Sequence, residues 1–399
     1  MKTVPEKLQG LFPAALRDTL LELRHDLHRH PELSFREERT AVRLERALAE
    51  LAPLALERVA GTGVVARIAG RDPRAPVVAL RGDIDALPIA EQTGKEHASQ
   101  NPGVMHACGH DVHATWVVGA GHLLRNDPAG GDVLLLLQPA EESGRGAPAV
   151  LETGALDDAR AIFGAHVDGA LAVGQVIAET GPIAAAADLF TIELRGRGAH
   201  AARPHEAADP VVGLAALVTS LQSIVSRRVE PGRAAVVTVA RLRAGSAPNV
   251  IPDEASLSGT LRASDAETRR RIQEQIGAIA AHTASAYGLE ARVQVEAGTP
   301  ALVNQPQPIG WCRAAVERLL GVEALRTLAA PNMAAEDFGF YLERMPGGFL
   351  RVGARDPATQ AAPAHTSRFY AADAAIFVGA AILAETARVA SDALGQAHP

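Results

Sequence analysis

The chain has few cysteines and no long apolar run. Only Cys108 and Cys312 occur in 399 residues, so disulfides cannot form its framework, and we expect a reducing compartment, the cytoplasm. The N-terminal stretch has neither an extended apolar segment nor a small-residue cleavage site, which argues against export. No segment approaches the roughly 18 uncharged apolar residues of a membrane-spanning helix, so we expect no membrane partner.

The chain also lacks positive charge and aromatic residues. Its formal net charge of -7 argues against nucleic-acid binding, which needs a basic surface. Aromatic residues make up 4% and hydrophobic residues 47%, so the core must be packed from Ala, Leu and Val. A length of 399 residues exceeds the usual single domain, and we therefore expect two domains.

The first part of the chain alternates between strand-like and helical patterns. Apolar residues recur at helical spacing in two stretches that flank His30-Pro31, and helical stretches also cover 114–125 and 146–152. Strand-like runs cover residues 63–68, 77–80, 133–137 and 162–167. The third run is apolar without alternation, as expected for a strand covered on both faces. This order predicts an α/β domain with a large, mostly parallel sheet.

The pattern changes near residue 185. Strand-like runs at 189–195, 235–242, 255–261 and 290–296 alternate with helical runs at 209–229 and 265–287. The order β-α-β-β-α-β is that of a ferredoxin-like α+β unit. We therefore expect residues 1–184 and 299–399 to form one discontinuous catalytic domain, with residues 185–298 inserted as a smaller domain.

Four separate segments carry residue types that bind metals. Cys108 and His110 lie two apart before a helical run, Glu141 and Glu142 follow the buried strand, and His166 and His365 come later. Thiolate, imidazole and carboxylate groups together suit zinc-type ions, and two ions need about five protein ligands. We predict that these are Cys108, His110, Glu142, His166 and His365.

Each residue has an ordinary alternative. A lone Cys is commonly an inert core residue, and His166 could be a hydrogen-bonded core histidine. Adjacent glutamates are common in the first turn of a helix. Cys108 could instead be a nucleophile paired with His110 or His113. The flanking glycine and histidines around Cys108 favour metal binding.

Two adjacent glutamates suit a division of labour. We assign Glu142 to the metal and Glu141 to proton transfer as general base. Asp83 or Asp85, after the run at 77–80, could hold a ligand histidine through its carboxylate, or either could be a solvated turn residue. Asp111 has the same two interpretations.

Several longer motifs resemble one known family, the amidohydrolase branch of the dinuclear aminoacylase/carboxypeptidase metallopeptidases. Hippurate hydrolases, N-acyl-amino-acid amidohydrolases and plant auxin-conjugate hydrolases belong to this branch. The resemblance covers the chain from about His25 to its last helix. It is carried by Leu80-Arg-Gly-Asp-Ile-Asp-Ala-Leu-Pro, Met105-His-Ala-Cys-Gly-His-Asp, Gln138-Pro-Ala-Glu-Glu, Ala247-Pro-Asn-Val-Ile-Pro-Asp and Glu336-Asp-Phe.

The resemblance implies roles for residues in both domains. It implies the same five metal ligands, Glu141 as base and Asp85 as a supporting carboxylate. His200 matches a histidine that holds the scissile carbonyl or oxyanion, and in dimeric relatives it reaches in from the partner subunit. Asn249 matches a polar substrate-binding position, and Arg262 is a weaker candidate for a carboxylate contact, with an ordinary strand-end arginine as the alternative.

The resemblance also implies the activity and the assembly. We expect a hydrolase that cleaves the amide bond of N-acyl amino acids or related small conjugates by a metal-activated water, with two divalent ions drawn from Zn, Mn, Co or Ni. The inserted domain is expected to serve as a lid and to form a homodimer or larger homo-oligomer. Dipeptidase or carbamoyl-amino-acid hydrolase activity, a Cys108-nucleophile amidase, and a metal-loaded binding protein are the alternatives.

Overall fold

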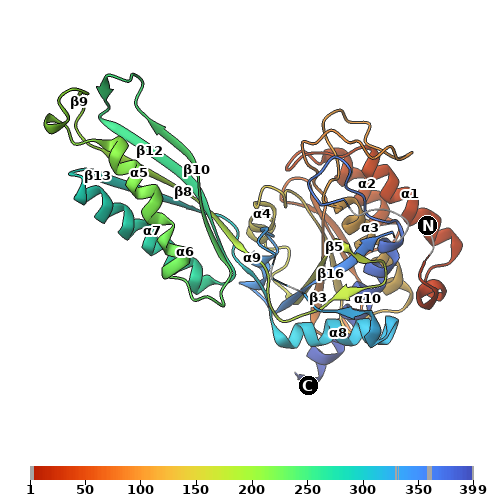
Figure 1. Ribbon diagram of the computed structural model, residues 1–399. Coiled ribbons are helices and arrows are strands. Elements are labelled where there is room, and N and C mark those ends of the chain that lie inside the picture. Colours follow the sequence, from red (N-terminus) through yellow and green to blue (C-terminus); the bar gives the residue numbers. More distant parts are fainter. Residues whose placement is uncertain (1–3, 329, 331, 357–361, 398–399) are drawn as a thin grey trace. The chain divides into compact units, whose positions relative to one another are not determined.

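The computed structural model describes residues 4–328, 330, 332–356 and 362–397 (Figure 1). The chain divides into two compact units, each described here by itself. The first comprises Met1–Gly181, Asn304–Ala329 and Phe340–Pro399, and the second comprises Pro182–Val303 and Ala330–Gly339. The second unit thus includes a short segment near residue 335 that we had placed in the catalytic domain, because its backbone pairs with strand residues at the start of that unit.

An eight-stranded sheet forms the centre of the first unit, in the order β1-β2-β4-β3-β5-β16-β6-β15. Its middle strands β4, β3, β5 and β16 are parallel, whereas β1 and β2 add antiparallel pairs at one edge. The α/β class with a mostly parallel sheet is therefore confirmed. The strands are β1 Ala55–Val59, β2 Gly63–Ile68, β3 Val77–Asp83, β4 Val133–Gln138, β5 Ala159–Ala172, β6 Val176–Ile177, β15 Leu325–Arg326 and β16 Gly347–Arg355.

Helices pack against this sheet, and α10 lies at the centre of the packing. It contacts α3, α8 and the strands β3, β5 and β16. A Cβ atom on Gly379 in α10 would come within 2.1 Å of the Trp116 ring in α3, so these helices approach closely only because residue 379 is glycine. The helices are α1 Ala14–Arg29, α2 Glu38–Ala49, α3 His110–Asn126, α4 Gly146–Glu152, α8 Pro306–Leu320, α9 Gly339–Leu342 and α10 Ala374–Ala397, with 3₁₀ turns η1 Glu6–Leu11 and η3 Val322–Ala324.

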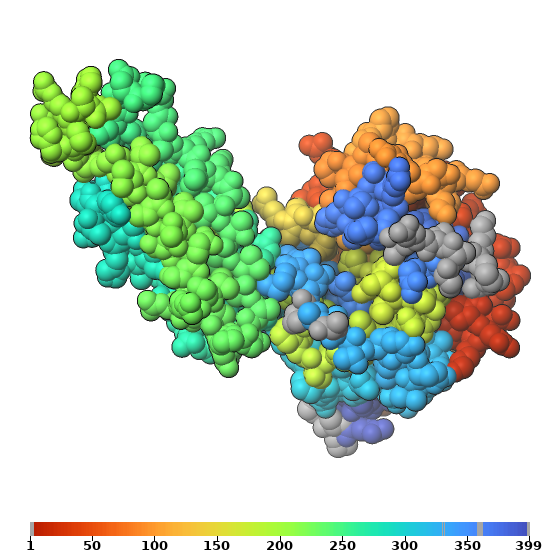
Figure 2. Space-filling model, viewed as in Figure 1, coloured from red at the N-terminus to blue at the C-terminus, as the bar shows by residue number. Residues whose placement is uncertain are grey.

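The second unit has the expected β-α-β-β-α-β order. Its antiparallel sheet runs β10-β12-β8-β13, and Figure 2 shows α5 and α6 at the surface of this unit. Asp209 and Asp265 accept backbone hydrogen bonds at the starts of α5 and α7, as N-cap residues do. The elements are β7 Gly181–Ala184, β8 Ala186–Arg195, β9 Ala199–His200, η2 Pro204–Glu206, α5 Pro210–Leu221, α6 Ser223–Arg227, β10 Ala235–Ala244, β11 Val250–Ile251, β12 Glu254–Ala263, α7 Ala266–Ala286, β13 Glu290–Ala297 and β14 Leu302–Asn304.

Two helical stretches are apolar and long enough to cross a membrane, contrary to our reading of the sequence. They are Pro210–Arg227 and Ala374–Gln396. Length and composition are weak criteria, because the core helix of a globular unit satisfies them equally well. The second stretch is 83% buried inside the protein and is the central helix of the first unit.

Candidate metal centre

The turn before α3 brings two of the predicted ligands to one place. Gly109 has a φ angle of 91°, and α3 begins at the next residue, so His110 lies in the helix and not in a loop before it. A Cβ atom at position 109 would come within 2.5 Å of the Val167 side chain. Only glycine combines this left-handed conformation with this close approach, and it lets Cys108 and His110 face the same space.

His166 meets Cys108 from the neighbouring strand. It lies inside β5, within the strand-like run predicted at 162–167, and its Nε2 atom is 3.3 Å from Cys108 Sγ. The His166 Nδ1–H group donates a hydrogen bond of 2.7 Å to the carbonyl of Val167. Nε2 is therefore the unprotonated nitrogen and directs its lone pair toward Cys108, the arrangement typical of a ligand histidine.

Glu142 and His365 meet on another side of Cys108. Their Oε2 and Nε2 atoms are 3.4 Å apart. His365 adopts a φ angle of 62°, unusual for a residue with a side chain, and its backbone N–H donates a 2.8 Å hydrogen bond to the carbonyl of Ala107. This bond ties a segment from the end of the chain to the residue beside Cys108. Strained backbone of this kind is common at functional sites.

The predicted ligands thus form overlapping groups. Cys108 clusters with His110 and His166 in one group and with Glu142 and His365 in another. Within each group, the ligand atoms lie within 4.8 Å of one another. Glu141 and Glu142 also cluster with His110, whose Nε2 atom is 3.9 Å and 3.8 Å from the two carboxylates. Cys108 is the side chain common to the first two groups.

Two of these ligand atoms are buried without a hydrogen-bond partner among the described residues. They are His110 Nε2 and Glu142 Oε1. Buried polar atoms are nearly always satisfied, and a pair of unsatisfied atoms facing each other is the state expected of ligands to an ion. The donor set of one thiol, three imidazoles and a carboxylate suits Zn, Co, Ni or Mn. The residues therefore fit a metal centre.

Asp85 organises the surroundings of this cluster. Its carboxylate lies 3.2 Å from His110 Nδ1 and accepts hydrogen bonds from the backbone N–H groups of Glu141 at 3.1 Å and Glu142 at 3.0 Å. The Ser34 hydroxyl donates a fourth bond, of 2.6 Å. Burial alone would raise the pKa of Asp85, but the bonds to His110 and Ser34 lower it. Asp85 is thus a buried carboxylate and not a solvated turn residue.

Replacing Asp85 by Asn should weaken metal binding by about 10- to 100-fold, the usual effect of losing a group that orients a ligand histidine. The amide has one acceptor oxygen where the carboxylate has two, so it cannot serve His110 and both glutamate N–H groups. The dissociation constant for Zn²⁺, measured against a competing chelator, checks this. Ser34→Ala removes one donor to the same carboxylate, and an Asp85→Asn enzyme that bound zinc more tightly than the Ser34→Ala enzyme would contradict the assignment.

A second buried pair, Asp83 and His113, supports His166 indirectly. Asp83 Oδ1 is 2.6 Å from His113 Nδ1, and His113 Nε2 accepts a 3.0 Å hydrogen bond from the backbone N–H of Val167. Arg81 donates a 2.5 Å bond to the other oxygen of Asp83. Our sequence interpretation considered Asp83 as a carboxylate that holds a histidine, but it missed the positioning role of His113. The sequence spacing could have indicated this pair, because Asp83 is two residues before Asp85 and His113 is one helical turn after His110.

The electrostatics of Cys108 argue against the alternative of a thiol nucleophile. Burial, together with the nearby negative charges of Glu142 and Asp83, raises the pKa of the Cys108 thiol to about 12. A catalytic cysteine needs the opposite shift, because only the thiolate attacks. Metal binding removes the thiol proton outright, so the same burial is compatible with a ligand.

Asp111, the residue after His110, belongs to a buried ionic network. Its Oδ2 atom accepts a 2.9 Å bond from Arg24 Nε and lies 2.9 Å from His28 Nδ1, while His28 Nε2 lies 3.3 Å from Glu91. Burial would lower the pKa of His28, but Asp111 and Glu91 raise it to about 9. His28 is therefore charged at neutral pH, and Asp111 is paired in the interior, not solvated.

This network should make folding stability fall between about pH 6.5 and 9. His28 binds its proton more tightly in the folded state than at its ordinary pKa of 6.5, so its contribution is complete below 6.5 and is lost by pH 9. The loss is about 3 kcal/mol at most. Urea unfolding of wild type and His28→Gln from pH 6 to pH 9.5 checks this. The variant should show a clearly shallower slope, the exposed-residue control His282→Gln should keep the wild-type slope, and equal slopes in all three would refute the assignment.

The predicted substrate-binding residues lie in the second unit, in two places. β9 and β11 pair His200 with Val250, and the backbone of Asn249 accepts a 3.1 Å bond from Ala201, so His200 and Asn249 are neighbours. Both are exposed. Arg262 lies near the other end of β12, eight residues beyond Glu254, which is about 25 Å along a strand. The structure thus brings His200 and Asn249 together but not Arg262, whose guanidinium bonds the carbonyl of Leu261.

Comparison with known proteins identifies a family match, similar sequences and a similar solved structure. Residues 79–389 match Peptidase family M20/M25/M40. The chain is 41% identical to N-acetyl-L-cysteine deacetylase of Bacillus subtilis (strain 168), over 88% of this chain and 84% of that protein. It is 37% identical to IAA-amino acid hydrolase ILR1-like 4 of Arabidopsis thaliana, over 86% and 78%. The crystal structure of the Bacillus subtilis YXEP protein, described as a dinuclear metal binding peptidase from the M20 family, superimposes with a TM-score of 0.85 at 34% identity, covering 95% of this chain and 99% of that chain.

Proposed function

This chain belongs to Peptidase family M20/M25/M40, and we propose that it hydrolyses the amide bond of N-acyl amino acids or related small amide conjugates. The observation that carries the proposal is the convergence of Cys108, His166 and His365 from three distant segments, next to paired glutamates. The two named relatives are a deacetylase of N-acetyl-L-cysteine and a hydrolase of IAA-amino acids, and the M20 family structure is described as dinuclear metal binding. The acyl amino acid is the substrate class that those relatives suggest for this chain.

We propose Cys108, His110, Glu142, His166 and His365 as the ligands of two divalent ions. Zn, Mn, Co or Ni all suit this donor set. When bound, the ions would supply Lewis acidity and make water acidic enough to ionise near neutral pH. Support for two positions comes from the two ligand groups that share Cys108.

Glu141 is the proposed general base. Its carboxylate is largely buried, with 9% exposure, and lies 3.9 Å from His110, so it borders the ligand cluster without being needed to complete it. It would take a proton from the attacking water and deliver it to the amide nitrogen as the C–N bond breaks. The Asp85 bond to its backbone N–H holds it in place for both transfers.

The second unit supplies the proposed substrate contacts. His200 would donate a hydrogen bond to the oxygen that gains negative charge on the scissile carbonyl, and Asn249 beside it would bind another polar group of the substrate. Closure of this unit as a lid would exclude water from the reaction, and we propose a homodimer or higher homo-oligomer formed through it. The exposure of His200 and Asn249 in the isolated chain supports a role completed by another surface.

An amine-release assay tests the proposal. The protein would be stripped with a strong chelator, reloaded with Mn²⁺, Co²⁺, Zn²⁺ or Ni²⁺, and incubated with N-acetyl, longer N-acyl and aryl amino acids, dipeptides and carbamoyl amino acids. We expect turnover to vanish on stripping and to return with metal, fastest on an N-acyl amino acid.

The pattern of rates separates the alternatives. Turnover that persists in the chelator would refute the metal mechanism in favour of a thiol nucleophile. Preference for dipeptides or carbamoyl substrates would keep the mechanism but correct the substrate class. A metal-loaded protein that releases no amine from any of them would be a binding protein.

A further inference from the structure

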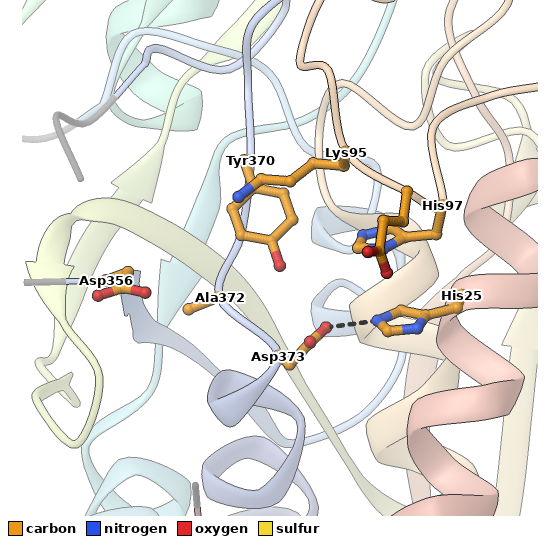
Figure 3. A pocket seen from close by; sticks show the side chains of 8 residues that line it. His25, Lys95, His97, Asp356, Tyr370, Ala372 and Asp373 are labelled. Carbon is orange, nitrogen blue, oxygen red and sulfur yellow. Dashed lines mark hydrogen bonds and ion pairs between the residues drawn. The ribbon is translucent and has the colours of Figure 1, made fainter. Parts of the chain in front are cut away.

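A second cluster of metal-binding side chains lies beside a cavity of about 220 Å³ in the first unit (Figure 3). It is built from His25 on α1, His97 in the loop of residues 88–104, and Asp373 just before α10. That loop, orange in Figure 2, lies against the blue segment near residue 367, to which Gln92 donates a backbone hydrogen bond. None of these side chains takes part in the centre around Cys108.

The three side chains offer ligand atoms at suitable distances. One atom of each lies within 4.8 Å of the others, and His25 Nε2 is 3.0 Å from Asp373 Oδ1. Two imidazoles and one carboxylate form a common ligand set for Zn, Fe, Ni and Cu, with positions left open for water. The open positions would face the cavity, which provides room for that water.

His97 is the member whose environment is otherwise unexplained. It is 7% exposed, and its Nε2 atom has no hydrogen-bond partner among the described residues. Burial, together with the nearby charge of Arg24, lowers the pKa of His97 to about 3, so the ring is neutral and keeps a lone pair. A buried lone pair without a donor is costly, and a bound cation would satisfy it.

The charged residues that line the cavity favour a cation, whereas the charges of Arg24 and His28 oppose one at His97 itself. Three carboxylates, Glu96, Asp356 and Asp373, line it against one lysine. That lysine, Lys95, directs its Nζ atom over the ring of Tyr370, 4.0 Å from the centroid, as Figure 3 shows. Arg24 lies behind Asp373 and donates to its Oδ1 atom, which leaves Oδ2 for an ion and fixes the carboxylate as an outer partner of a ligand does.

One adjustment is needed for binding. The rings of His25 and His97 are stacked with centroids 3.9 Å apart and an angle of 6° between planes. A metal ion lies in the plane of each imidazole that binds it, so one ring must turn about its Cβ–Cγ bond. That torsion is broad for histidine, and the cavity beside the rings gives space for the turn.

We propose that His25, His97 and Asp373 bind one divalent transition-metal ion, in addition to those of the Cys108 centre. The ion joins α1, the 88–104 loop and the start of α10, three segments far apart in sequence. The loop has no helix or strand of its own, so such a link would hold it in place. The site is therefore structural, and it is independent of the proposed hydrolytic function.

Metal counting tests this on the full-length protein. Wild type and the variants His97→Phe and His25→Phe would be loaded with Zn²⁺, passed through a desalting column and analysed for zinc per chain. We expect each variant to retain one ion fewer than wild type. Zinc should also raise the melting temperature of Cys108→Ser, which keeps this cluster intact, more than that of Cys108→Ser/His97→Phe.

The exposed residue His205 provides the matched control. His205→Ala should retain as many ions as wild type, whereas a loss there would identify adventitious surface binding and overturn the proposal. Equal zinc in wild type and in a folded His97→Phe or His25→Phe protein would overturn it as well. The two variants remove ligands on different elements, so either one that folds, as judged by circular dichroism, gives the answer. Amide hydrolysis is not a readout, so failure of the hydrolase proposal would not affect the result.

Discussion

Glu141→Gln should lower kcat about 1000-fold, within the range expected for loss of a general base. The glutamine side chain has the same size but cannot accept the proton of water or return it to the leaving nitrogen. The backbone bond from residue 141 to Asp85 is unaffected, so the fold and the ligand cluster should remain. Steady-state kinetics on the best N-acyl amino acid, with metal content and melting temperature measured on the same preparation, provide the check.

Glu142→Gln is the matched comparison, because the two glutamates are adjacent and both are bonded to Asp85 through their backbones. We expect this second variant to lose metal, since the Glu142 carboxylate lies between His110 and His365. The first variant should retain metal at the wild-type level. If Glu141→Gln remained fully active, or if it lost metal as Glu142→Gln does, the assignment of the base would be wrong.

The second large effect is expected from Gly109→Ala. The new Cβ atom would come within 2.5 Å of the Val167 side chain, and alanine at a φ angle of 91° is strained even in open space. Overpacking and backbone strain together should cost about 3 kcal/mol of folding free energy. Val167 is buried and β-branched, so its side chain has little room to turn away. We therefore expect the backbone between Cys108 and His110 to shift, with at least a roughly 100-fold loss of zinc affinity, measured by chelator competition.

Gly103→Ala separates strain from the clash. Gly103 also has a positive φ angle, of 78°, but a Cβ atom there meets nothing within 4 Å. This control should lose about 1 kcal/mol in urea unfolding and keep its zinc affinity. If both alanine variants bound zinc like wild type, the close approach at Gly109 would not be what positions the two ligands.

Local pattern was enough to predict most of the fold. The uninterrupted apolar run of β4 has the composition of a strand covered on both faces, and the apolar positions of α7 repeat at helical spacing. Features that depend on contacts between distant segments could not be predicted from the sequence. The predicted helix 209–229 is two helices that meet at Gln222, and the segment near residue 335 joins the second unit through long-range backbone pairing.

In the candidate site, too, the features encoded by nearby residues were predictable and those that join distant segments were not. The spacing of Cys108 and His110 and the paired glutamates pointed to the cluster that the structure assembles, because those signals lie within a few residues. The sequence allowed Asp85 to hold a ligand histidine, as it does with His110, but its bonds to Ser34 and to the backbone of Glu141 and Glu142 depend on segments that meet only in the fold. Arg262 was grouped with His200 by motif alone, and the length of β12 separates them.

The central position of α10 has a consequence for biosynthesis. This helix fills the space between α3 and α8, with Trp116 packed against Gly379, yet it leaves the ribosome after all of Pro182–Val303 (Figure 1). The second unit can therefore fold while the nascent first unit still exposes the apolar surface that α10 will cover. Until α10 has been synthesised and packed, that surface is available to chaperones and to aggregation.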